Sequence, residues 1–239
     1  LIAIPDDGYW LLCDDVRTVN LSGMGGKADA KVTATDVQHV SASGDLLFTW
    51  SPFEHFDIAD LDPASRSGSS VNWTHGNSLD LDGNGNVVVS FRNLNEITKI
   101  DTRTGSVLWR MGGTRNQFTF QDSTTLTSSY QHGVRWTSQG QLLFLDNLGD
   151  STSSRVLRYD FNALPHAARL AGAYRPVPEA VSQQGGSTQE LPSGRTLVSF
   201  GPAGRAEEYD ARGRVVWRIE GNPGYVFRAQ RIRSLYAPA

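Results

Sequence analysis

Short apolar runs, each bounded by turn residues, make up most of this chain. The runs at residues 87–89, 142–145 and 196–198 each follow a turn that contains glycine. Runs of this length between Gly, Asn, Asp and Ser residues are typical of β-strands joined as hairpins. No stretch of useful length places apolar residues at positions i, i+3, i+4 and i+7, so we expect little helix.

Two kinds of hairpin alternate along the chain. In the first kind a strand and a glycine turn lead into an apolar strand, as at residues 77–89, 133–144 and 187–198, with a fourth copy at residues 7–12 that lacks its first strand. In the second kind the second strand ends in an aromatic residue, as at residues 37–50, 97–109 and 207–217, with a degenerate version at residues 154–174. One hairpin of each kind makes a unit of about 40 to 55 residues, the size of a propeller blade.

The repeat predicts an all-β fold, a β-propeller of four-stranded antiparallel blades with about four blades in a single domain over residues 1–239. Trp50, Trp109 and Trp217 fall at the same place in the repeat, and we expect them to pack between blades. The chain opens on what resembles the second strand of a blade, and residues 225–232 resemble the first strand of one. Either these ends pair within one blade, or further blades precede Leu1.

Composition narrows the class of protein. With 239 residues, of which 38% are hydrophobic and 10% aromatic, the chain can bury a substantial core. The net charge of −3 comes from well-mixed acids and bases without a basic stripe, so we expect no nucleic-acid partner. No apolar run approaches the ~18 to 20 residues of a membrane helix, so we expect no membrane span. The single cysteine, Cys13, excludes an intrachain disulfide, and its apolar surroundings predict a buried, inert thiol.

The candidate functional residues lie at the ends of predicted strands. Three polar clusters, at residues 72–78, 90–93 and 130–133, each adjoin an apolar strand and contribute His75, Arg92 and His132. Long polar insertions at residues 51–71 and 114–129 run into the histidine clusters, and a shorter one covers residues 180–186. Since the loops at one mouth of a propeller often carry its function, we expect these insertions to form walls or lids of a site.

These motifs together resemble the arylsulfate sulfotransferase (arylsulfotransferase, ASST) family. The similarity covers nearly the whole chain in the right order. It rests on the segments at residues 47–55, 73–78, 90–92, 104–113, 131–132, 146–147, 154–155 and 227–236. The family's propeller has six blades, which implies that N-terminal blades are missing here.

The resemblance implies a transferase that moves a sulfuryl group from an aryl sulfate to a phenolic acceptor without a nucleotide donor or other cofactor. Carried over by motif, His132 is the nucleophile that becomes transiently sulfated, and His55, His75 and Arg92 hold the sulfuryl oxygens. Asn77 and Arg155 complete the implied substrate-binding set. Gly133 departs from the family's pattern, in which an acidic or small residue is common after the nucleophile. The family also implies a periplasmic or secreted protein that acts on small phenolic molecules, and it leaves a homodimer open.

The residue types suit this chemistry. A neutral imidazole is a good nucleophile near pH 7 because its ordinary pKa is about 6.5. The planar guanidinium of Arg92 can bind two oxygens of an oxyanion at once and remains charged. Fixed donors of this kind stabilise the negative charge that develops on a transferring sulfuryl group. His75 or His55, if neutral, could take the proton of the incoming phenol.

Other interpretations compete with this one. A histidine at a strand end is usually structural, as we expect for His39 and His166, and Arg155 could be an ordinary surface arginine. Three histidines could instead bind zinc, but no His-x-x-x-His pattern is present, so we expect no metal. Residues 80–85 imitate the start of a calcium loop, yet Phe91 occupies the twelfth position, which favours a β-turn. A non-catalytic binding platform and an aryl sulfate hydrolase are the alternative functions.

Overall fold

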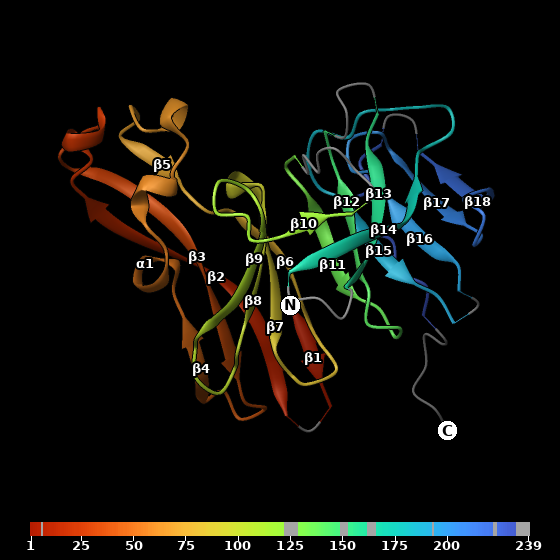
Figure 1. Cartoon of the computed structure of the whole chain (residues 1–239), viewed down its shortest axis with the longest axis horizontal. Coiled ribbons are helices and arrows are strands. Elements are labelled where there is room, and N and C mark those ends of the chain that lie inside the picture. The colour runs from red at the N-terminus through yellow and green to blue at the C-terminus, as the bar shows by residue number, and fades with distance from the viewer. Residues whose placement is uncertain are drawn as a thin grey trace.

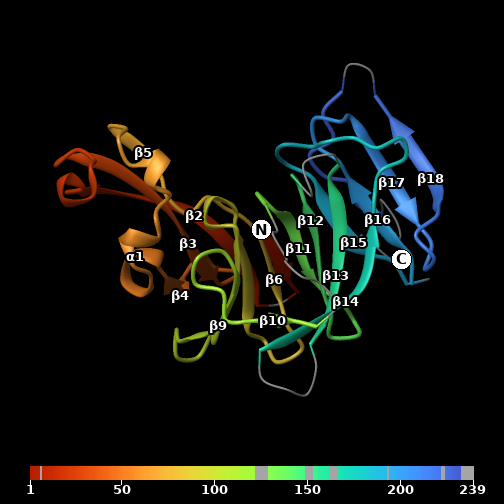
Figure 2. The same cartoon turned by 45° about the horizontal axis from the view of Figure 1, so that its top comes forward.

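The structure, a computed structural model, describes residues 1–5, 7–121, 129–148, 153–161, 166–192, 194–221 and 224–232. Its strands form four mainly antiparallel sheets in chain order, of which the first two overlap on the left of Figures 1 and 2 and the third and fourth lie on the right. The predicted all-β architecture of four-stranded blades is confirmed.

The first sheet has the strand order β1-β2-β3-β4, and β5 pairs in parallel with the far end of β3. Its strands are β1 (Ile2–Ile4), β2 (Gly8–Val19), β3 (Ala30–Val40), β4 (Leu46–Trp50) and β5 (Ser70–Asn72). The prediction that this blade lacks its first strand was wrong, because β1 pairs antiparallel with β2 and Ile4 lies opposite Gly8. With only three residues, β1 is too short to give a clear apolar pattern.

The second sheet has the order β6-β7-β8-β9. Its strands are β6 (Gly76–Leu81), β7 (Val87–Phe91), β8 (Glu96–Ile100) and β9 (Val107–Gly112). The turn between β6 and β7 is closed by Asp82, whose Oδ1 accepts hydrogen bonds from the backbone N–H groups of Asn84 and Asn86. Asp82 also forms a salt bridge with Lys99 at 2.6 Å. This carboxylate therefore closes a β-turn, as the sequence predicted for the calcium-like segment.

The third and fourth sheets repeat the plan. The third contains β10 (Thr119–Phe120), β11 (His132–Trp136), β12 (Leu142–Asp146), β13 (Arg155–Phe161) and β14 (Ala167–Tyr174), with β10 added in parallel at its outer edge. The fourth contains β15 (Ser187–Glu190), β16 (Thr196–Ser199), β17 (Arg205–Tyr209) and β18 (Val215–Glu220).

Helices are short, as predicted. The described part of the chain contains α1 (Pro52–His55) and 3₁₀ turns at Ser22–Met24, Ile58–Asp60, Pro63–Ser65 and Arg92–Leu94. The insertion at residues 51–71 thus folds into α1, two 3₁₀ turns and β5. Residues 122–128 of the second insertion lie outside the described residues.

The core consists of three apolar layers, each between two consecutive sheets. In β7, Val87 and Val89 face the first sheet while Val88 faces the third, because successive strand residues point to opposite faces. In β12, Leu142 likewise faces the second sheet and Leu143 the fourth. Strands buried on both faces read as continuous apolar runs, which is why these strands were visible in the sequence. Sheets stacked face to face in chain order are the blades of a β-propeller.

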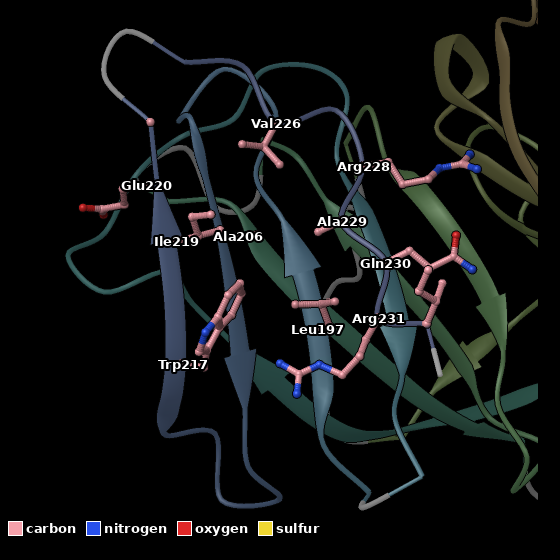
Figure 3. Close-up of a pocket in the computed structure, with 12 residues that line it drawn as sticks. Leu197, Ala206, Trp217, Ile219, Glu220, Val226, Arg228, Ala229, Gln230 and Arg231 are labelled. Atoms are coloured by element: carbon pink, nitrogen blue, oxygen red, sulfur yellow. The ribbon is translucent and has the colours of Figure 1, made fainter. Parts of the chain in front are cut away.

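The repeated tryptophans divide into two cases. Trp50 donates its indole N–H to Gly105 O of the second blade, and Trp109 packs against Phe118 and Phe161 of the third, so both pack between blades as predicted. Trp217 differs, because its side chain lies on the open face of the fourth blade and is 42% exposed (Figure 3). No further described sheet covers that face.

The C-terminal segment lies beside β15. Ser187 Oγ accepts the N–H of Ala229 at 3.2 Å, and Gln189 Oε1 accepts that of Arg231 at 2.8 Å. The same pair of contacts joins β6 to β11, where Ser78 and Asp80 accept the N–H groups two residues apart on β11. Residues 225–232 therefore take the place of an inner strand next to β15, as their sequence predicted.

Cys13 is half-buried rather than buried, because it lies on the outer part of the long β2 hairpin. Its thiol contacts Gln38 Oε1 at 3.3 Å. Burial raises the pKa of this thiol, and Asp36 and Asp14 raise it further, so the inert form is favoured.

Candidate functional site

His132 begins β11 and is 4% exposed. Its Nδ1 lies 2.9 Å from Tyr130 O and 2.9 Å from Asn147 Oδ1. Because both of these atoms are acceptors, Nδ1 carries the proton. Nε2 accepts the backbone N–H of Gly185 at 3.2 Å. The imidazole is thus held as the neutral Nδ1–H tautomer, with its lone pair on Nε2.

The environment keeps this ring neutral. Burial, together with the nearby Arg92 and His75, lowers the pKa of His132 to about 4, although the hydrogen bonds of Nδ1 with Asn147 and Tyr130 O oppose this shift. Burial is the largest of these causes, since an imidazolium loses its hydration in the interior. At neutral pH the ring is therefore the free base, with its Nε2 lone pair accepting the Gly185 N–H.

Asn147 connects His132 to the loop at residues 180–186. Its Nδ2 donates to Ser182 O at 2.8 Å and to Gly185 O at 2.9 Å, which turns Oδ1 toward His132. Ser154 Oγ donates to Asn147 O and accepts the N–H of Ser182. The loop therefore forms a wall of the site on the Nε2 side of His132.

The backbone conformation explains why a glycine occupies position 133, where the sequence departs from the family pattern. Its φ is +65°, and a Cβ at this position would lie 2.7 Å from Ser187 Cα and 2.9 Å from Thr188 N. Only glycine fits where β11 approaches β15 this closely. The same residue produces the irregular register that begins at His132.

His75 and Arg92 are joined through their backbones. Arg92 N donates to His75 O at 3.0 Å, and Asn93 N donates to Thr74 O at 3.2 Å. The His75 ring lies edge-on to that of His132, with 6.5 Å between ring centroids. Burial lowers the pKa of His75, and Arg92 lowers it further. His75 Nδ1 lies 2.9 Å from the amide Nδ2 of Asn72, a contact that favours the Nε2–H tautomer and leaves Nε2–H as a donor.

Arg92 lies in the 3₁₀ turn after β7, with its guanidinium 4.0 Å above the Tyr130 ring. Its Nη1 donates to Asn93 Oδ1 at 2.9 Å, and no carboxylate among the described residues forms a salt bridge with it. The positive charge is therefore free to face an anion. Arg92 also lines a pocket of about 210 Å³, together with Leu61, Asp62, Ser65, Asn72, Trp73, Asn93 and Tyr130.

Strained backbone conformations are concentrated around His75, Arg92 and His132. Positive φ occurs at His75 (+49°), Asn95 (+52°) and Tyr130 (+57°), three of the four non-glycine cases in the described chain. Asn95 Oδ1 accepts the N–H of Tyr130 at 2.8 Å. Such conformations are costly for non-glycine residues and tend to persist at functional sites.

The other predicted substrate-binding residues support this cluster from outside. Asn77 donates from Nδ2 to Gln131 O at 2.7 Å, which fixes the strand entry beside His132. Arg155 forms a 2.8 Å salt bridge with the buried Asp146. A contact of either side chain with substrate stays a prediction.

His55 is exposed on α1, and its ring stacks on Trp50 with centroids 4.8 Å apart. No contact within the described ranges joins it to His75, Arg92 or His132, so its role also stays a prediction. The structure thus brings His75, Arg92 and His132 together and adds Tyr130, Asn147 and Gly185. Tyr130 and Asn147 lie within the sequence motifs, whereas Gly185 acts through its backbone N–H and leaves no side-chain signal.

Among the residues that the structure describes, no group of three or more His, Cys, Asp or Glu side chains could hold a metal ion. None of the described helices has the length and apolar character that crossing a membrane requires.

Comparison with known proteins gives one family match. The model of the arylsulfotransferase (ASST) family matches residues 2–222. No curated protein matches the chain significantly.

Several solved structures are similar at low identity. A streptogramin B lyase is 14% identical over 64% of this chain and 43% of that chain, with a TM-score of 0.44. A virginiamycin B lyase from Staphylococcus aureus is 11% identical over 87% and 59%, with a TM-score of 0.46. The β-propeller domain of Cps50 (Swd1) from Myceliophteria thermophila is 13% identical over 82% and 55%, with a TM-score of 0.40. The chain thus covers 43%, 59% and 55% of the lengths of these structures.

Proposed function

Because the chain belongs to the arylsulfotransferase (ASST) family, we propose that it transfers a sulfuryl group from an aryl sulfate to a phenolic acceptor through a sulfated His132. The observation that carries this proposal is the tautomer of His132. A neutral ring with its proton on Nδ1 leaves the lone pair on Nε2, and this ring lies edge-on to that of His75 with 6.5 Å between centroids. No cofactor is needed for this chemistry.

In the first step, the Nε2 lone pair attacks sulfur and forms the N–S bond while the S–O bond to the aryl group breaks. The aryl oxide leaves with that electron pair and takes a proton from solvent or a nearby acid. Arg92 and the Nε2–H of His75 would bind the sulfuryl oxygens, whose negative charge is shared with the leaving oxide in the transition state. Asn147 and Tyr130 O hold the Nδ1 proton and stabilise the positive charge that develops on the ring.

In the second step, the oxygen of the acceptor phenol attacks sulfur, the N–S bond breaks, and His132 recovers its lone pair. The phenol must lose its proton in this step. In the tautomer that Asn72 favours, Nε2 of His75 already carries a proton and Nδ1 accepts from the Asn72 amide, so the phenol proton passes to solvent unless that amide turns away from Nδ1. The pocket of about 210 Å³ next to Arg92 is the place proposed for the aryl group.

One contact favours a second candidate function. The Gly185 N–H points at Nε2 of His132 from 3.2 Å, so the lone pair is engaged in this conformation. Sulfuryl transfer requires Gly185 to withdraw, whereas a non-catalytic binding platform would keep His132 as a buried structural residue. An aryl sulfate hydrolase would use the same residues with water as the acceptor.

The test is release of 4-nitrophenol from 4-nitrophenyl sulfate, with and without added phenol, by the wild type and His132→Ala. Release that requires phenol and His132 supports transfer, and release that requires His132 alone supports hydrolysis. His166→Ala is the matched control, because His166 is exposed and lies outside the site. No release from the folded wild type would favour the platform.

Two predictions about the whole protein remain part of this proposal. The family resemblance predicts a periplasmic or secreted location, which fractionation of the source cells would test. It also leaves open a homodimer, which the molar mass in solution would decide.

A further inference from the structure

A second polar cavity lies beside the inner strands, further along them than His132. It has a volume of about 480 Å³, and its walls include β6, β11, β15 and the C-terminal segment. A turn follows each of the three inner strands, and in each turn the first residue donates its backbone N–H to the carbonyl oxygen of the residue four positions later. These first residues are Asp82, Thr137 and Leu191. Asp80, Arg135 and Gln189, each two residues earlier, are therefore equivalent positions, and all three line the cavity.

The charge in this cavity is unbalanced. Arg135 and Arg228 both line it, and Asp80 is the only carboxylate among its lining residues. The Asp80 carboxylate already accepts the N–H groups of Trp136 at 2.8 Å and Leu81 at 3.0 Å. Among the side chains that line the cavity, two guanidinium groups stand against one carboxylate, which leaves about one net positive charge.

The two arginines have free donors. Arg135 uses Nη1 for Leu79 O at 3.2 Å and Val134 O at 2.7 Å, so its remaining N–H groups are available. Burial lowers the pKa of Arg135, the nearby Asp80 raises it and Arg228 lowers it, so both an acid and a second base lie near this guanidinium. Asp80 lines the same cavity and acts on Arg135 electrostatically, but neither guanidinium forms a direct salt bridge with a carboxylate in the described part of the chain.

Arg228 and Arg231 point in different directions although they are three residues apart. Figure 3 shows Arg228 directed away from the open face of the fourth blade, whereas Arg231 extends toward Trp217. Arg231 is also occupied, because it forms a 2.8 Å salt bridge with Glu208 and lies over the Trp217 ring. In the C-terminal segment, Arg228 therefore lines the cavity and Arg231 packs on the open face of the fourth blade.

We propose that Arg135 and Arg228 form an oxyanion site in this cavity, which binds a sulfate group as the free ion or as part of an aryl sulfate. The choice of sulfate rests on the proposed function, whereas the preference for an oxyanion rests on the cavity alone. Arg135 is three residues from His132 along β11, on the order of 10 Å at the usual strand rise. The site is therefore separate from the position of the transferring sulfuryl group, and it would hold a second sulfate near the reacting one.

Calorimetric titration of the whole chain with sodium sulfate at constant ionic strength tests this site. We expect saturable binding that Arg228→Gln weakens by about tenfold or more, since hydrogen bonds to charged groups are strong. Arg231→Gln removes the same charge from the same segment and should leave sulfate affinity unchanged. Arg135→Gln should also weaken binding, but Arg228→Gln decides the outcome if that variant does not fold.

A parallel titration of His132→Ala with 4-nitrophenyl sulfate separates the two sources of the sulfate group. If both sulfate and 4-nitrophenyl sulfate bind in a way that depends on Arg228, the site recognises the sulfate group itself. If only 4-nitrophenyl sulfate binds in this way, the site recognises the aryl sulfate donor. The absence of saturable binding, or equal losses in Arg228→Gln and Arg231→Gln, would overturn the proposal. Sulfate binding without phenol-dependent turnover would contradict the proposed function but support this site. Phenol-dependent turnover without sulfate binding would contradict this site but leave the proposed function standing.

Discussion

Asn147 Oδ1 lies 2.9 Å from Nδ1 of His132, and this contact, together with Tyr130 O at the same distance, determines which ring nitrogen carries the proton. The amide cannot turn around, because its Nδ2 is held by Ser182 O and Gly185 O. One buried side chain therefore supports the Nδ1–H tautomer of His132 and anchors the loop that faces Nε2.

Replacement of Asn147 should change the tautomer before it changes anything else at the site. In Asn147→Leu the Nδ1–H loses its side-chain acceptor, and we expect the ¹⁵N resonances of His132 to shift toward a mixture of tautomers. Sulfuryl transfer should fall roughly ten- to a hundredfold, the range found for groups that orient ligating histidines. Asn84→Leu, in an exposed turn, is the control. Unchanged ¹⁵N resonances in the Asn147 variant would contradict this role.

Arg92 should contribute through the shape of its guanidinium as well as its charge. Arg92→Ala should lower kcat/KM for 4-nitrophenyl sulfate by about 10²- to 10³-fold, the usual effect of removing one oxyanion donor. Arg92→Lys should recover only part of this loss, because an ammonium lacks the planar fork. Arg103→Ala removes an exposed arginine as the control. Full activity in Arg92→Lys would show that charge alone is sufficient.

Acid should destabilise the fold through His132. The pKa of this ring is about 4 in the folded protein and about 6.5 in the unfolded chain, so the unfolded state binds more protons between these values. The free energy of unfolding should therefore fall as the pH drops from 6.5 to 4, by roughly 3 kcal/mol from this residue. Urea unfolding across this range would measure it, with His132→Gln as the comparison. Equal pH dependence in both proteins would show that the ring is not held neutral.

Gly133 should resist substitution more than an ordinary turn glycine. Gly133→Ala and Gly140→Ala share a positive φ, but Gly140 faces open space whereas a Cβ at Gly133 meets backbone atoms of β15. We expect Gly133→Ala to lose about 1 to 3 kcal/mol more stability than Gly140→Ala, the usual cost of overpacking. Similar urea midpoints for the two variants would mean that β11 and β15 separate easily.

The sequence predicted the fold well because the blades are buried on both faces. The apolar runs of β7 and β12, together with their glycine turns, mark the repeat directly. The short β1 and the exposed Trp217 were misjudged, since a three-residue strand carries little pattern and a repeat position does not reveal what covers it.

The site was only partly predictable. His75, Arg92 and His132 follow from their strand-end motifs, but the state of His132 depends on Asn147, Tyr130 O and Gly185 N. Two of these three contacts involve backbone atoms, whose positions depend on φ values and loop packing rather than on residue type. His55 fits the motif order, yet its ring stacks on Trp50 at the surface.

The central claim is that Nε2 of His132 becomes sulfated. The most direct test is a rapid mix of the protein with one equivalent of 4-nitrophenyl sulfate without acceptor, followed by mass spectrometry of the peptide that contains His132. The account predicts a burst of about one equivalent of 4-nitrophenolate and the mass of one SO₃ group on His132, which added phenol removes. Turnover without this adduct, or an adduct that persists in His132→Ala, would contradict it.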